Sequence, residues 1–159
     1  MTMQLTVDQI TQIGDLAGSS SKLNNFISSI NAYADMSPDL SIRKEVNDWM
    51  MRRDRQALSC TDWCHLFSHQ PQAQAVLAFI YEQFAQYSGL DFRRVRPDDS
   101  LNSHLHFPLV CWFDWSITFC EDFFQAFEVD LSDRFDESDF ITLGEMATFL
   151  MEQVASQAS

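Results

Sequence analysis

Apolar residues recur at helical spacing along most of this chain, and few helix-breaking residues interrupt them. The 159 residues include only four glycines and four prolines, so long segments lack the residues that most often end a helix. Between Pro71 and Gly89, for example, Val76, Ile80 and Phe84 fall on one face of a helix. No segment alternates apolar and polar residues long enough to predict a strand. The sequence therefore predicts an all-α protein.

Seven helices are expected, and residues typical of helix ends border most of them. The expected helices cover residues 5–17, 23–34, 39–55, 60–67, 71–88, 112–127 and 142–154. Pro71 suits a helix start, since its missing N–H would have no partner within the helix. Thr142 and Glu145 have the spacing of a capping box. A structured loop at 90–100 and a short turn at 136–140 are expected between helices.

The charge balance changes near residues 68–74, and this change predicts two parts. Residues 1–75 carry 8 acidic and 6 basic residues, whereas residues 76–159 carry 15 acidic and 4 basic residues. We therefore place a domain boundary after residue 70. A helical N-terminal segment at 1–70 would precede an acidic helical domain at 71–159.

The chain as a whole carries 23 acidic and 10 basic residues, a formal net charge of −13. Such a charge argues against nucleic-acid binding, which needs clustered lysines and arginines to contact the phosphates. It would instead attract basic partners. No 18-residue apolar run and no secretory signal occur, and the four cysteines are expected to stay reduced. We therefore expect a cytoplasmic protein that does not bind a membrane and whose partner is a protein with a basic surface. The sequence leaves the oligomeric state open.

A zinc site is the strongest candidate for metal chemistry. Its ligands would be Cys60, Cys64, His65 and His69. Zinc needs four ligands that converge tetrahedrally, but on one helix the histidines lie to the side of the face that carries the cysteines. We therefore expect buried thiols and two surface histidines, with a zinc-dependent protein as the alternative.

Catalytic groups are hard to find in this sequence. No GxSxG elbow, glycine-rich phosphate loop or HExxH motif occurs. His104 and His106 lie in a loop without cysteines at ligand spacing, and the arginine-rich stretches 52–55 and 93–96 are expected to be solvated or to cap helices. The carboxylates at 121–139 are typical of a solvated acidic face. We therefore expect no enzyme, no metal and no cofactor.

The most informative segment is residues 111–130, CWFDWSITFCEDFFQAFEVD, in which two apolar stripes adjoin. The first stripe, expected to face the core, holds Phe113, Ile117, Cys120, Phe124 and Phe127. The second holds Trp112, Trp115, Phe119 and Phe123. A central helix packed on two sides would bury both stripes. In the alternative, a partner-binding surface is formed by Trp112, Asp114, Trp115, Phe119, Glu121 and Asp122, because aromatic residues are favoured as interface anchors.

The order of features in residues 74–155 resembles an acyl carrier protein, particularly the divergent carrier-like proteins of unknown function in enteric bacteria. The resemblance rests on VLAFIYEQFAQYSGLDFRRVRPDDSL as first helix and loop, on the helix at 112–127, and on its exit FEVDL. It also rests on the short element at 136–140 and the last helix at 142–154. The resemblance implies a four-helix bundle with an acidic recognition helix.

One departure from the carrier pattern bears directly on function. Carriers attach phosphopantetheine to a serine in an Asp-Ser-Leu turn, whereas this chain reads Asp114-Trp115-Ser116. Ser116 would suit attachment only if the helix began later than residue 112. The resemblance therefore implies the carrier fold without its usual prosthetic group.

These observations predict a non-catalytic, acidic protein that binds or regulates another protein. Ten carboxylates and one cation lie between Asp114 and Glu145, and they would steer a basic partner towards the aromatic residues. One alternative is an inhibitor or immunity protein that neutralises a basic toxin or nucleic-acid-binding protein. The other alternative is a functional acyl carrier modified on Ser116.

Overall fold

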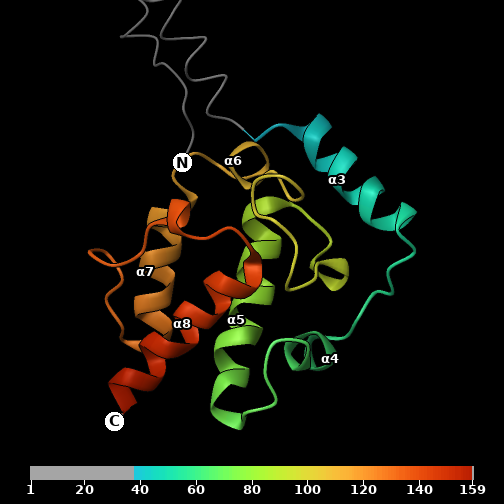
Figure 1. The fold of residues 1–159 in the computed structure, drawn as a ribbon. Helices are drawn as coiled ribbons and strands as arrows, with labels where there is room; N and C mark the ends of the chain where they lie inside the picture. The colour runs from blue at the N-terminus through green and yellow to red at the C-terminus, as the bar shows by residue number, and fades with distance from the viewer. Residues whose placement is uncertain (1–37, 159) are drawn as a thin grey trace, which may run out of the picture. The chain divides into compact units, whose positions relative to one another are not determined.

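The computed structural model of the chain describes residues 38–158, so the helices expected at 5–17 and 23–34 lie outside the described residues. The described part is helical, as predicted, and contains six α-helices and two short 3-10 helices (Figure 1). These are α3 (Leu40–Arg52), α4 (Cys60–His65), α5 (Pro71–Ser88), η1 (Phe92–Arg94), α6 (Phe107–Val110), α7 (Trp115–Phe127), η2 (Glu137–Asp139) and α8 (Leu143–Ala158). No strand is present in residues 38–158, although Ser100 and Thr142 form an isolated antiparallel bridge.

Side chains and special backbone geometry fix the ends of these helices. Asp39 caps α3, because its Oδ1 accepts a hydrogen bond from the Ile42 N–H at 3.1 Å. The Thr142 hydroxyl accepts a hydrogen bond from the Glu145 N–H at 3.1 Å, which is one of the two hydrogen bonds of the predicted capping box. Gly89 ends α5 with a φ of 68°, a left-handed conformation that glycine adopts without a steric penalty.

Helix α5 occupies the centre of the described unit, with α4 packed on one side and α7 and α8 on the other (Figure 1). Its Phe84 is fully buried and contacts aromatic rings of η1, α6 and α7. Its ring centroid lies 5.0 Å from that of Phe119, 5.6 Å from that of Trp115 and 5.7 Å from that of Phe107. One aromatic cluster therefore ties α6 and α7 to the central helix.

Helices α3 and α4 belong to the same compact unit as the C-terminal helices. That unit begins at Pro38, and its core includes Met50 from α3 and Trp63 from α4, both fully buried. The Trp63 indole also donates a hydrogen bond to the Val95 carbonyl at 2.9 Å. The boundary predicted after residue 70 is therefore corrected, because the charge change that suggested it concerns the surface and not the core.

The connection between α5 and α7 is more structured than the sequence predicts. It contains η1 and the unpredicted helix α6, whose second residue is Pro108. Backbone hydrogen bonds from Leu101 to Ile141 and from Leu143 to Asp99 fasten this connection to the start of α8. As a result α7 begins at Trp115, three residues later than predicted.

Candidate functional site

The outer side of α7 and the turn before it leave large apolar side chains in contact with solvent. The exposed fractions are 46% for Phe113, 63% for Ile117 and 52% for Phe124. Trp112, in the turn before the helix, is 39% exposed. Ile117 and Phe124 are seven residues apart in α7 and therefore share one face of the helix, whereas Phe113 lies in the turn just before the helix. An apolar surface of this kind marks an interaction site more often than a single exposed side chain does.

The expectation that Phe113, Ile117 and Phe124 face the core is wrong, because all three are exposed, whereas most of the second stripe is buried, as packing of a central helix on two sides predicts. Trp115 is only 6% exposed and Phe119 and Phe123 are fully buried, so these rings belong to the core. The predicted partner contacts of Trp115 and Phe119 are therefore corrected. Phe119 packs against Phe84 and Phe135, with ring centroids 5.0 and 5.3 Å apart.

The three acidic residues predicted to bind a partner have different surroundings. Glu121 is exposed, and Asp114 is half-buried at the N-terminal end of α7, where its carbonyl accepts the N–H of Ile117. Asp122 is half-buried and accepts a hydrogen bond from the Tyr87 hydroxyl at 2.5 Å. Burial and this hydrogen bond raise the pKa of Tyr87 well above its usual range. Asp122 therefore joins α7 to α5 and is less available to a partner than Glu121.

The field around α7 is negative, as the thiol of Cys120 shows. Burial raises the pKa of this thiol, and the nearby carboxylates of Glu137, Asp130 and Glu121 raise it further. Negative charges oppose thiolate formation in this way because they disfavour a second anion nearby. We call residues Trp112, Phe113, Asp114, Ile117, Glu121 and Phe124 the α7 face; all of them are exposed except Asp114, which is half-buried. It combines apolar contact area with negative charge.

Ser116 lies in the first turn of α7 and is half-buried. Ser116 is expected to suit attachment only if the helix begins later than residue 112, and α7 begins at Trp115. The residue before Ser116, Trp115, is a core residue and not part of an exposed turn.

A small aromatic pocket of about 210 Å³ lies beside the beginning of α7. It is lined by Leu101, Asn102, Phe107, Pro108, Trp112, Phe113, Trp115 and Glu137. Phe107 and Trp115 are buried and Trp112 and Phe113 are exposed, so the first two form the floor and the others the rim. This pocket could not be predicted from the sequence, because its lining comes from three segments that no motif connects.

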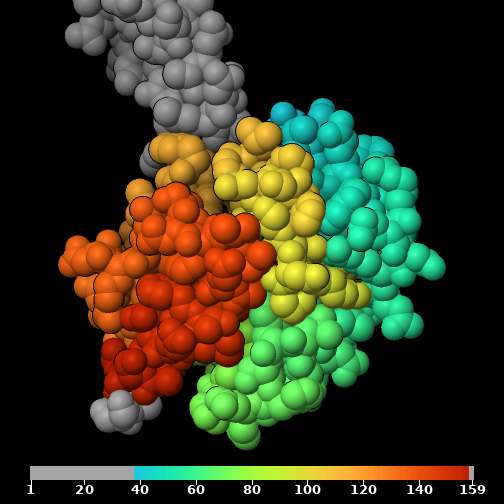
Figure 2. Space-filling view, viewed as in Figure 1, coloured from blue at the N-terminus to red at the C-terminus, as the bar shows by residue number. Residues whose placement is uncertain are grey.

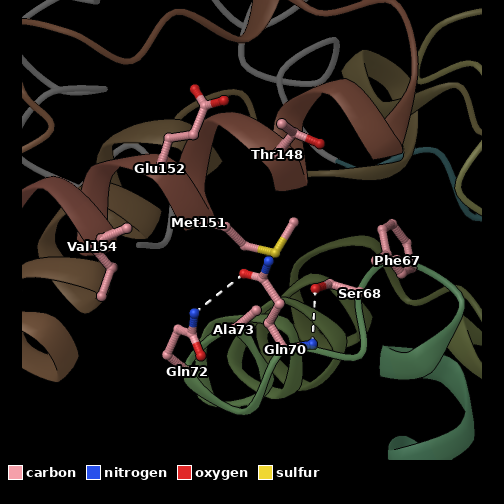
Figure 3. A pocket seen from close by; sticks show the side chains of 10 residues that line it. Phe67, Ser68, Gln70, Gln72, Ala73, Thr148, Met151, Glu152 and Val154 are labelled. Atoms are coloured by element: carbon pink, nitrogen blue, oxygen red, sulfur yellow. Dashed lines mark hydrogen bonds between the residues drawn. The ribbon is translucent and has the colours of Figure 1, made fainter.

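A larger hollow of about 610 Å³ separates the C-terminal half of α8 from the start of α5 (Figure 2). Met151 extends from α8 towards Ala73 and Gln70, while Ser68 accepts a hydrogen bond from the Gln70 N–H at 3.1 Å (Figure 3). Glu152 is the one acidic or basic residue in its lining. Acid–base chemistry needs a second titratable group in a contrasting environment, and this hollow does not supply one from the described residues.

The arginine-rich stretches meet in the structure, but their charges are mostly used internally. Arg55 forms a bidentate ion pair with the buried Asp99, with N–O distances of 2.7 and 2.8 Å. Arg93 and Arg94 both bind Asp91, and hydrogen bonding to Arg93 helps to hold the pKa of Asp91 below its usual value. The Arg55–Asp99 pair fixes the 91–99 loop to the segment that follows α3, whereas the two pairs with Asp91 lie within the loop.

The candidate zinc ligands do not converge. Cys60 and Cys64 have sulfur atoms 4.0 Å apart, and burial raises the pKa of the Cys64 thiol to about 12. The rings of His65 and His69 contact each other in a tilted arrangement, with centroids 4.9 Å apart. Within residues 38–158, no group of three or more His, Cys, Asp or Glu side chains is placed to hold a metal.

His104 and His106, singled out from the sequence, lie near the end of α3. The Nδ1 atom of His104 accepts a hydrogen bond from the Ser100 N–H at 2.9 Å, and its ring stacks on Trp49 at 5.3 Å. This contact fixes the turn at 100–104 to α3, which is a structural role.

The chain was compared with protein-family models, with curated proteins and with solved structures, and none of them matches it. Among the described residues, no helix combines the length and the apolar character needed to cross a membrane.

Proposed function

We propose that this chain is a non-catalytic, acidic protein that binds or regulates another protein through the α7 face. The observation that carries the proposal is the joint exposure of Phe113, Ile117 and Phe124 beside Glu121. Complete burial of one such side chain is worth about 1.5–3 kcal/mol, and each of these three, being 46–63% exposed, forgoes about half of that free energy. A partner that covers this face would recover that free energy.

Charge supports a basic partner for the α7 face. Between Asp114 and Glu145 the chain has ten carboxylates and a single cation, Arg134, and Arg134 is engaged with Gln153 and the Asp130 carbonyl. A negative field of this kind accelerates the encounter with a positive surface and repels acidic ones. The apolar side chains would then supply the desolvated contact area.

We further propose that residues 71–158 adopt an acyl-carrier-like arrangement, with α3 and α4 added to it. In support, α5, a long connection, α7, η2 and α8 follow each other in the order that the resemblance implies. The helix that would be the recognition helix of such a fold is α7, which carries the proposed face.

A functional carrier modified on Ser116 is a second candidate, favoured by the start of α7 at Trp115. Intact-mass measurement after co-expression with a phosphopantetheinyl transferase tests it. A carrier would gain the mass of one phosphopantetheine, and Ser116→Ala would abolish the gain. An unchanged wild-type mass would exclude the carrier reading.

The binding proposal is tested by affinity capture from native cells with matched variants of the full chain. Ile117→Asp and Glu121→Lys should each reduce recovery of the bound partner, whereas Ile141→Asp should not, because Ile141 is equally exposed but outside the face. A nuclease or another nucleic-acid-binding protein as the captured partner would favour the inhibitor form of the proposal. Equal recovery by all variants would contradict the α7 face as the interface.

A further inference from the structure

The aromatic pocket beside α7 combines aromatic rings with a carboxylate, and the two favour the same ligand. Four of its eight lining residues are aromatic, namely Phe107, Trp112, Phe113 and Trp115. The one charged residue of the lining is Glu137, which is exposed and forms no ion pair within residues 38–158. Ring faces and a carboxylate both attract cations.

The geometry of the pocket suits a flat cation. The rings of Phe107 and Trp115 meet at 88°, with centroids 5.6 Å apart, and so give the floor two differently directed aromatic walls. Trp112 and Phe113, 39% and 46% exposed, add accessible ring surface at the rim. A planar guanidinium can stack on such a ring and also offer its N–H groups to a carboxylate.

The surrounding charge distinguishes a cation from an apolar chain as the occupant. No lysine or arginine lines the pocket, and Glu137 acts together with Asp130 and Glu121 on the nearby Cys120 thiol. An apolar group would gain nothing from this field and would desolvate Glu137 in part. An anion would be repelled by it.

We propose that this pocket binds the guanidinium of an arginine side chain presented by the partner protein. Stacking on Trp112 and Phe113 and an ion pair with Glu137 would hold the cation, and the apolar side chains of the α7 face would flank it. This inference rests on the proposed function, because it assigns an anchor residue to the partner of the same face.

The test uses N-acetyl-arginine amide as probe, N-acetyl-citrulline amide as its neutral counterpart, and the full-length protein labelled with ¹⁵N at its tryptophan indoles. The arginine probe should shift the indole signals of Trp112 and Trp115 in a saturable manner and leave that of Trp63 unchanged. The citrulline probe should shift none of them. Glu137→Gln and Trp112→Leu should each weaken binding of the arginine probe about fivefold.

Asp133→Asn is the matched control, because Asp133 is an exposed acid of the same acidic segment outside the pocket. Equal weakening by Asp133→Asn and Glu137→Gln would overturn the proposal, as would equal binding of the two probes. A stronger response to N-acetyl-norleucine amide would overturn it too and make the pocket apolar in specificity. None of these measurements requires the partner protein. If the pocket does not bind the arginine probe, the capture experiment with Ile117→Asp still tests the α7 face independently.

Discussion

The pair of Arg55 and Asp99 is the most buried ion pair among residues 38–158, and of these pairs its loss should cost most. Asp99 is 2% exposed and accepts two hydrogen bonds from Arg55 and one from the Arg96 N–H. Asp99→Asn would leave the Arg55 charge uncompensated in a partly buried site, and we expect the free energy of unfolding to fall by about 3 kcal/mol. Urea denaturation at pH 7 measures this change. Asp48→Asn, which breaks an exposed pair with Lys44, should change it by less than about 1 kcal/mol.

A buried thiol at the end of α6 should make the protein sensitive to alkali. Burial raises the pKa of Cys111 from its usual 9.0 to about 12. The folded state therefore holds this proton more tightly, so its contribution to stability is complete below pH 9 and is lost as the pH rises towards 12. Each pH unit in this window should lower the free energy of unfolding by up to about 1.4 kcal/mol for this thiol. Under reducing conditions, Cys111→Ala should flatten the decline, and an unchanged slope would contradict this role.

The two sides of α7 give the most direct prediction at the scale of a single helix. Phe119 is fully buried and Phe124 is 52% exposed. Phe119→Ala should lower the free energy of unfolding by about 3–5 kcal/mol, because it opens a cavity among aromatic rings. The same substitution at Phe124 should cost less than about 1 kcal/mol and reduce partner capture instead. Comparable losses of stability at both positions would contradict the assignment of the two sides.

Helix positions could be predicted from the sequence more reliably than the faces that the helices bury. Pro71, Gly89 and the Thr142 cap are local signals, and the helices that they border agree with the predictions. On α7 both sides are apolar, so periodicity could not decide which side packs on α5. Phe84 determines which side is buried, because its ring packs against Trp115 and Phe119 although it lies about 30 residues earlier in the chain. Such a long-range contact leaves no pattern within the helix itself.

At the scale of the whole described unit, α3 and α8 should unfold together. Met50 and Leu150 are fully buried in one hydrophobic cluster, although the sequence places them in different predicted domains. Met50→Ala and Leu150→Ala should each destabilise the protein by about 2–5 kcal/mol and shift the same transition. Circular dichroism and tryptophan fluorescence should report coincident midpoints. A separate early transition in Met50→Ala alone would support a boundary near residue 70.

The acidic residues behind the net charge of −13 are unevenly distributed along the chain. Residues 1–75 are nearly balanced, while residues 76–159 have 15 acidic and 4 basic residues. The arginines of the 93–96 stretch bind Asp91 or backbone carbonyls, whereas Glu121 on α7 has no cationic partner in residues 38–158. Binding of the partner should therefore weaken as salt is raised, with the association rate falling more than the dissociation rate changes. An association rate that does not depend on salt would contradict electrostatic attraction between the partner and the α7 face.

Site-specific photocrosslinking in native cells tests the central claim, that the outer side of α7 is a protein interface. A benzoylphenylalanine at position 117 or at position 141 would replace side chains that are 63% and 69% exposed, respectively, and only position 117 belongs to the α7 face. We expect a discrete protein adduct from position 117, weakened by Glu121→Lys, and no such adduct from position 141. No adduct from position 117, or the same adducts from both positions, would contradict the claim.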